Sequence, residues 1–223
     1  MRRYLGEMLM KPAAFIMTFW ALVAAPIQSA SAHPVAYQGA VGVMTWNQPF
    51  LSDYWLTYSF RPDMAIAAHA MRMTMATGGD LVVYMPQFDY LVKRWNKTDS
   101  QANIYVYGGF GGVRYQSQNG TAGLVGVEAD AESRKYFGML KYEVMLPTIG
   151  ADFRQFVARV GIAPYEAEIN EVASWFMIQG QYNPSLSRSY AITPLVRFFY
   201  KSVLWETGVS TQGDWMLNFM FHF

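Results

Sequence analysis

Trp215-Met-Leu-Asn-Phe-Met-Phe-His-Phe223 is the last stretch of the sequence, and its side chains follow the period of two that is typical of a β-strand. In a strand, this period places five apolar side chains on one surface: Trp215, Leu217, Phe219, Phe221 and Phe223. Asn218 and His222 fall on the opposite surface. A soluble domain seldom offers such an apolar surface to water, whereas a strand whose outer face meets lipid requires one. The stretch therefore predicts a membrane-facing strand.

The same residues resemble the C-terminal strand of Gram-negative outer-membrane β-barrel proteins, in which the terminal Phe belongs to a signal for the barrel-assembly machinery. The resemblance implies that Phe219, Phe221 and Phe223 form this assembly signal. It also implies that outer-membrane lipid and the barrel-assembly machinery are partners. The expected location is the cell outer membrane, which the chain reaches through the periplasm.

The N-terminus has the layout of a secretory signal peptide. Arg2, Arg3 and Lys11 precede an apolar run at 12–25, and the small-residue stretch Ser29-Ala-Ser-Ala32 follows. The alternative is a single anchoring helix, but the run is short for a hydrocarbon layer about 30 Å thick. We expect residues 1–32 to be a cleaved signal peptide and 33–223 to form one β-barrel domain.

Composition narrows the class of the expected mature chain. Residues 33–223 carry 14 Lys and Arg against 15 Asp and Glu, so no basic face is available for nucleic acid. The chain contains no cysteine, and 17% of its residues are aromatic, as in barrels with interfacial aromatic girdles. No stretch of the mature chain reaches the ~20 apolar residues of a membrane helix. An exported, apolar chain of this kind predicts a closed barrel.

Segments of strand-like residues separated by turn residues continue through the whole mature chain. We predict a transmembrane antiparallel up-and-down β-barrel of about twelve strands, with ten as the alternative count. The expected strands are 39–47, 54–60, 65–75, 81–95, 102–115, 123–132, 136–145, 153–163, 173–182, 190–200, 203–210 and 215–223. Residues 116–120 are expected to form a loop. A two-residue hairpin at Lys201-Ser202 places Arg197 opposite Glu206, and Glu206 then falls near Asn218.

Charged residues of both signs share the face opposite the apolar one. In a barrel this face is the lumen, where we expect Glu128, Asp130, Lys141, Glu143, Arg159, Arg197 and Glu206. Two interpretations stay open: a paired network that fills a narrow barrel, or the lining of a porin-like passage for small polar solutes. A soluble, lipocalin-like cup would instead turn its charged face outward.

His69-Ala-Met-Arg-Met-Thr-Met75 carries a second pattern, because His69, Met71, Met73 and Met75 share one strand face. Thioethers and imidazole suit copper(I) or silver(I), so a lumenal row predicts soft-metal handling. In the alternative, the methionines are apolar filler against lipid and Arg72 points inward. Metal ions and small polar solutes are therefore the candidate partners of the lumen.

Catalytic and cofactor motifs are weak in this chain. A membrane-embedded lipid hydrolase is an alternative function, but the mature chain has only His33, His69 and His222 and no G-x-S-x-G elbow. Gly108-Gly-Phe-Gly-Gly112 lies within a strand, where glycines permit bending or close packing. We predict that the protein is not an enzyme and binds no cofactor.

Four further segments are similar to an uncharacterised family of exported Gram-negative proteins. They are residues 91–96, 99–105, 162–165 and 193–197. This similarity implies an outer-membrane protein and assigns no role to any residue.

Overall fold

The computed structural model describes residues 34–168 and 170–223, and this part of the chain folds into twelve strands. The strands are β1 (Val41–Gln48), β2 (Leu51–Arg61), β3 (Met64–Thr74), β4 (Asp80–Asn96), β5 (Ser100–Tyr115), β6 (Gln118–Ser133), β7 (Tyr136–Pro147), β8 (Phe153–Ile162), β9 (Ala173–Tyr182), β10 (Tyr190–Tyr200), β11 (Val203–Val209) and β12 (Trp215–His222). Within these ranges no helix is long and apolar enough to cross a bilayer. The expected signal peptide, residues 1–32, lies outside the described residues.

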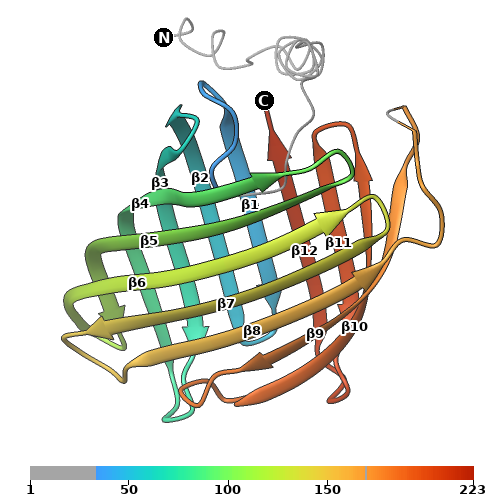
Figure 1. Ribbon diagram of the computed structural model, residues 1–223. Coiled ribbons are helices and arrows are strands. Elements are labelled where there is room, and N and C mark those ends of the chain that lie inside the picture. The colour runs from blue at the N-terminus through green and yellow to red at the C-terminus, as the bar shows by residue number, and fades with distance from the viewer. Residues whose placement is uncertain (1–33, 169) are drawn as a thin grey trace, which may run out of the picture.

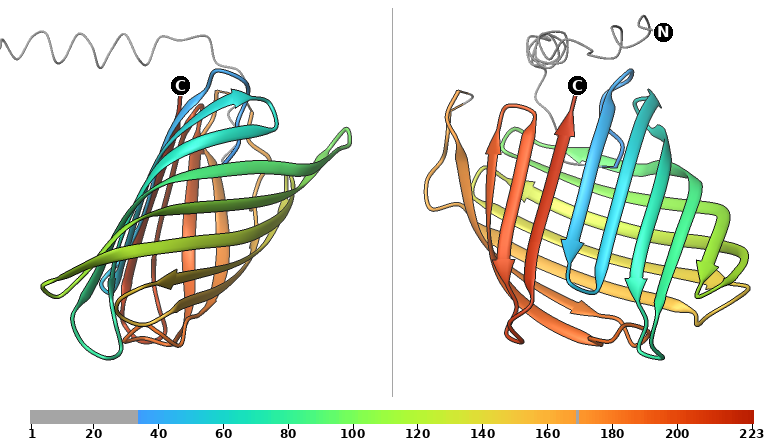
Figure 2. Two further views of the ribbon diagram at one scale, coloured as in Figure 1. Left: turned by 90° about the vertical axis from the view of Figure 1, so that its left-hand side faces the viewer. Right: turned by 180° about the vertical axis from the view of Figure 1, so that it is seen from behind.

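Each strand pairs antiparallel with the next one along the chain, and β1 pairs with β12 to close the barrel. Figure 1 shows β5 to β8 running across the view in front of the steeper β1, β2, β11 and β12. The two views of Figure 2 show the same strong tilt between these walls. We call the end at which β1 begins and β12 ends the terminal end, and the opposite end the distal end.

The count of twelve strands is confirmed, and the alternative count of ten is wrong. One predicted loop needs correction: Gln118–Gly120 belongs to β6, and only Gln116-Ser117 turns the chain. Tyr115 pairs with Gln118, and Gln116 adopts a φ of 54°, so a tight turn replaces the expected five-residue loop. The polar side chains of these residues favour a loop, but their backbone groups still pair with β5 because the ladder does not depend on side-chain polarity.

The outer surface of the barrel is apolar. Large exposed side chains include Leu56, Phe110, Val125, Val160 and Phe176, which are 53% to 65% exposed. Exposed aromatic residues also stand where strands begin or end: Tyr136, Tyr182, Tyr190, Tyr200 and Trp215. Apolar flanks with aromatic residues at strand ends are typical of a barrel in lipid. The alternative of a soluble cup with a charged exterior is therefore wrong.

The interior divides into two halves. Most of an apolar cluster lies in the distal half, where Gln155 and Gln181 are also buried; its members include Met73, Leu81, Leu124, Met145 and Phe153. Polar and charged side chains occupy most of the middle and the terminal half. At the terminal mouth the segment 34–40 folds inward, where Val35 packs with three inward residues of the wall: Ala65, Leu91 and Tyr105.

The wall is irregular at Pro86, in the middle of β4. Pairing between β4 and β5 is interrupted between Tyr84–Gly112 and Gln87–Gly109. Proline has no N–H to donate to the ladder. A Cβ on Gly111 would overlap the carbonyl oxygen of Tyr84, so this close approach requires glycine. The glycine-rich segment thus permits close backbone packing, as the sequence predicted.

We expect Gly111→Ala to destabilise the barrel and Gly112→Ala to leave it nearly unchanged. The added methyl group at residue 111 meets backbone atoms of β4, whereas a Cβ on Gly112 meets nothing within 4 Å. Overpacking of this kind costs about 1 to 3 kcal/mol. Urea unfolding in detergent micelles measures both variants, and equal midpoints would contradict the close packing seen at Pro86.

Candidate functional site: the charged lumen

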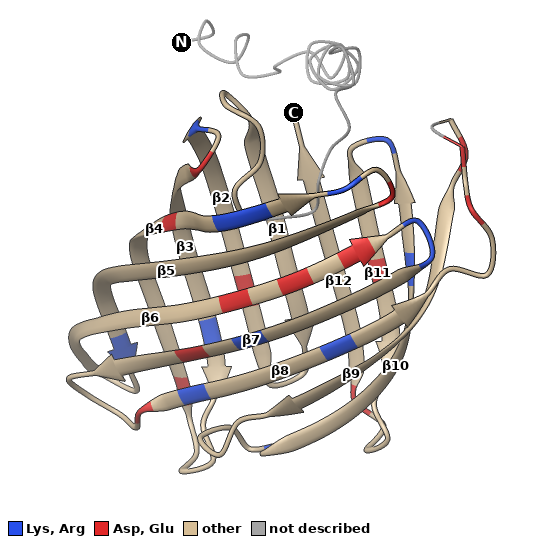
Figure 3. Ribbon diagram, in the orientation of Figure 1, with Lys and Arg blue, Asp and Glu red and all other residues tan. Residues whose placement is uncertain are grey.

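All seven charged residues expected in the lumen lie on inward strand faces. They are Glu128 and Asp130 on β6, Lys141 and Glu143 on β7, Arg159 on β8, Arg197 on β10 and Glu206 on β11. Figure 3 shows acidic residues spaced along β6 and charges of both signs on neighbouring strands. Their side chains face the interior because the apolar residues that alternate with them face outward.

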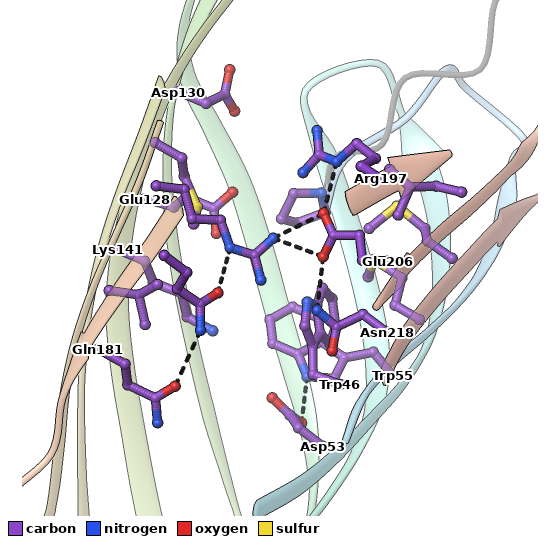
Figure 4. Close-up of a pocket in the computed structure, with 18 of the residues that line it drawn as sticks. Trp46, Asp53, Trp55, Glu128, Asp130, Lys141, Gln181, Arg197, Glu206 and Asn218 are labelled. Atoms are coloured by element: carbon purple, nitrogen blue, oxygen red, sulfur yellow. Dashed lines mark hydrogen bonds and ion pairs between the residues drawn. The ribbon is translucent and has the colours of Figure 1, made fainter. Parts of the chain in front are cut away.

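Glu206 forms the centre of a buried bridge across the lumen. Its carboxylate lies 3.0 Å from Nη1 of Arg159 and 2.7 Å from Nε of Arg197. Asn218 donates to the same carboxylate from β12 at 2.7 Å, and Nε of Arg159 donates to Gln179 at 2.6 Å. Figure 4 shows this chain of contacts spanning the cavity. Five strands, β8 to β12, are therefore tied together through the inside of the barrel.

The sequence predicted two of these contacts through register. Arg197 pairs with Glu206, and Glu206 with Asn218, so both expectations are confirmed. Arg159 reaches Glu206 from three strands away, across the curve of the wall. No pairing rule in the sequence indicates that contact, because it depends on how sharply the barrel closes.

Lys141 of β7 makes a second set of contacts across the barrel interior, with residues of β2 and β5. Its ammonium lies 3.0 Å from Glu143 and above the ring centroids of Trp55 and Tyr107, at 5.4 and 5.7 Å. Tyr107 donates its hydroxyl to Glu143 at 2.9 Å. A cation over aromatic faces is stabilised more strongly where water is displaced. Lys141 thus packs against Trp55 of β2 as well as pairing within its own strand.

Acidic side chains are concentrated on β6. Glu128, Asp130 and Glu132 follow one another on its inward face and line the same cavity as Arg159 and Arg197. Asn103 donates to Asp130 at 2.7 Å. The cavity is about 100 Å³ in volume, enough for a few water molecules. The lumen is thus a narrow internal space lined by both signs of charge.

The His69–Met75 row points into the barrel. His69 lies 2.6 Å from Asp53 through Nε2, and its ring packs 4.8 Å from that of Trp55. Met71, Met73 and Met75 are buried on the same face, while Arg72 is exposed and pairs with Asp80. The alternative with lipid-facing methionines and an inward Arg72 is therefore wrong. Within the described ranges, no three His, Cys, Asp or Glu side chains form a metal-binding group.

The sequence does not predict several interior polar residues. The expected strand 54–60 leaves Asp53 in the preceding connection, yet Asp53 belongs to β2 and contacts His69. The alternation of Leu51, Asp53 and Trp55 was the available signal. Asp89 is likewise buried on β4, where Gln87 donates to it at 2.7 Å.

A closed twelve-stranded barrel with an apolar exterior and a charged interior defines the class of this protein. It is an integral β-barrel of the outer membrane.

No protein-family model and no curated protein matches the sequence. Among solved structures, the chain is similar to "KdgM porin in complex with disordered oligogalacturonate", with a TM-score of 0.48 and 9% identity. It is also similar to "KdgM porin", with a TM-score of 0.46 and 10% identity. Each likeness covers 82% of this chain and 98% of the other. Both are weak, and the class follows instead from the protein's own barrel and exterior.

We expect Glu206→Gln to destabilise the barrel by about 3 to 5 kcal/mol, because two buried guanidiniums lose their shared counter-charge. Asp63→Asn is the control. It removes an ion pair with Arg61 that is open to water, and such pairs contribute at most about 1 kcal/mol. Urea unfolding in the same micelles compares them, and equal losses would show that the buried bridge adds little.

Proposed function

We propose that this protein is an outer-membrane barrel whose narrow charged lumen is closed to free diffusion in the state described. The observation that carries the proposal is the bridge of Arg159, Glu206 and Arg197 across a cavity of only about 100 Å³. An open porin needs a continuous aqueous path, and these side chains line the cavity through which such a path would run.

The distal half supports the same conclusion. Met73, Leu81, Met145 and Phe153 are fully buried in its apolar cluster. A hydrated ion that reached this cluster would lose water without gaining polar partners. Apolar constrictions also close channels by excluding water. The barrel therefore has two successive barriers, one ionic and one apolar.

A porin-like passage for small polar solutes is the alternative for the same lumen. It would require side chains of the bridge and of the distal cluster to move aside. Because both signs of charge line the cavity, such a passage would discriminate weakly between anions and cations. In an outer-membrane barrel of this connectivity the terminal end faces the periplasm. A solute that enters from the periplasm would therefore meet the charged half of the lumen first.

A lipid hydrolase fits this geometry poorly. An enzyme acting on membrane lipid needs its base and nucleophile within reach of the bilayer. His69 and His222 are both buried on inward faces, and each is 3% exposed. His69 is held by Asp53 and packed against Trp55, away from lipid.

Planar-bilayer recording tests the closed lumen. We expect the folded wild-type protein to show no stable unit conductance, because ions find no continuous water path. Phe153→Ala removes only the apolar barrier, so we expect a leak when it is combined with Arg159→Ala, which removes the longest contact of the ionic bridge. The control combines Arg159→Ala with Phe156→Ala, which changes a side chain on the lipid face of the same strand. Regular open-channel steps from the wild type would favour the porin-like passage instead.

A further inference from the structure

Methionine is distributed unevenly between the two faces of the barrel. The described residues include eleven methionines, and nine of them are buried. In the same ranges, the large apolar side chains exposed to lipid are Leu, Ile, Val, Phe, Tyr and Trp, with no Met among them. Seven of the buried methionines share one interior cluster: Met44, Met71, Met73, Met75, Met85, Met145 and Met220. The interior is thus rich in thioether sulfur.

His69 lies beside this cluster with one ring nitrogen unused. Its Nε2 lies 2.6 Å from the carboxylate of Asp53, which accepts the hydrogen bond and so places the ring proton on Nε2. In the neutral ring, Nδ1 then carries a lone pair. It is buried and has no hydrogen-bond partner within the described part of the chain. A carboxylate that orients one nitrogen and leaves the other free is the usual arrangement of a metal-binding histidine.

Two methionines are placed to join this nitrogen. Met71 follows His69 by two residues on the same strand face, and Met85 is the cross-strand partner of His69 on β4. Partners directly opposite each other hold their Cβ atoms about 5 Å apart. In the structure the sulfur of Met85 lies against Gly109 of β5, and a rotation about the three flexible bonds of this side chain would turn it toward His69. Met73 and Met75 lie about 13 and 20 Å along the strand from His69, too far to share one ion with it.

We propose that His69, Met71 and Met85 form a binding site for one soft monovalent cation, copper(I) or silver(I). Nδ1 of His69 and the two thioethers supply the ligands, and Asp53 is a positioning residue that orients the imidazole. Soft ligands of this kind select copper(I) over zinc(II) or calcium(II). The carboxylate of Asp53 also balances the charge of a monovalent ion in a buried site.

The internal cavity extends to the neighbours of this site, which gives an ion a route to it from the lumen. Asp53, Trp55 and Met44 all line the internal cavity, and Trp55 packs directly against the His69 ring. Trp55 therefore reports on binding, because a cation beside its indole changes its fluorescence. The site is independent of whether the barrel conducts solutes.

Isothermal titration of the full mature chain in detergent micelles with silver(I), a redox-stable substitute for copper(I), tests the proposal. The expected result is one bound ion per chain with quenching of tryptophan fluorescence, and no binding of zinc(II). The double variant Met71→Leu and Met85→Leu keeps the packing volume and should lower the silver affinity at least about tenfold. His69→Gln keeps a donor for Asp53 but loses the ring lone pair, and it should lower the affinity likewise.

The matched control is the double variant Met177→Leu and Met216→Leu. These two methionines are buried in a separate cluster, so the control makes the same chemical change away from His69. Its silver affinity should equal that of the wild type. Heat-dependent migration on gels confirms that every variant is folded. The proposal is overturned if the wild type binds no silver, or if the two double variants bind it equally.

Discussion

Backbone hydrogen bonding in a medium without water is the constraint on which this structure depends. Each peptide group within the membrane needs a partner, and an open sheet would leave two edges unpaired. Pairing of β1 with β12 removes those edges. The turns at Gln116 and Lys201, both with positive φ, let successive strands follow one another with two-residue connections. Everything else in the molecule is arranged on the two faces of this closed ladder.

Closure also separates two solvents. Successive side chains along a strand face lipid and the barrel interior in turn, so two neighbouring residues lie in different environments. Charged residues can therefore occupy an apolar membrane protein without meeting hydrocarbon. Inside, they meet a narrow space where water is scarce, and the free energy of desolvation makes pairing necessary. The contacts of Glu206 with Arg159, Arg197 and Asn218 meet that requirement.

The same interior sets the functional possibilities. In the proposed closed state, ionic bridges in the middle and the apolar cluster in the distal half fill a barrel that could otherwise conduct. Met44, Met71 and Met85 contribute to this filling, and Met85 is the cross-strand partner of His69, whose Nδ1 has no hydrogen-bond partner in the described residues. Methionines that pack the interior are therefore also the proposed ligands of the cation. A barrel with a filled lumen can still bind an ion, because a small cation needs only a few ligands and little space.

The sequence by itself predicted the class, about twelve strands and the face of most side chains. Alternation at period two and the turn residues between segments carried these predictions, because strand periodicity and turn length are local properties. They also predicted the pairing of Arg197 with Glu206. The tertiary structure alone decided that Arg159 reaches Glu206, that Asp53 holds His69 and that Met85 lies opposite His69. Barrel closure and strand stagger set these contacts between distant residues, and no local pattern encodes them.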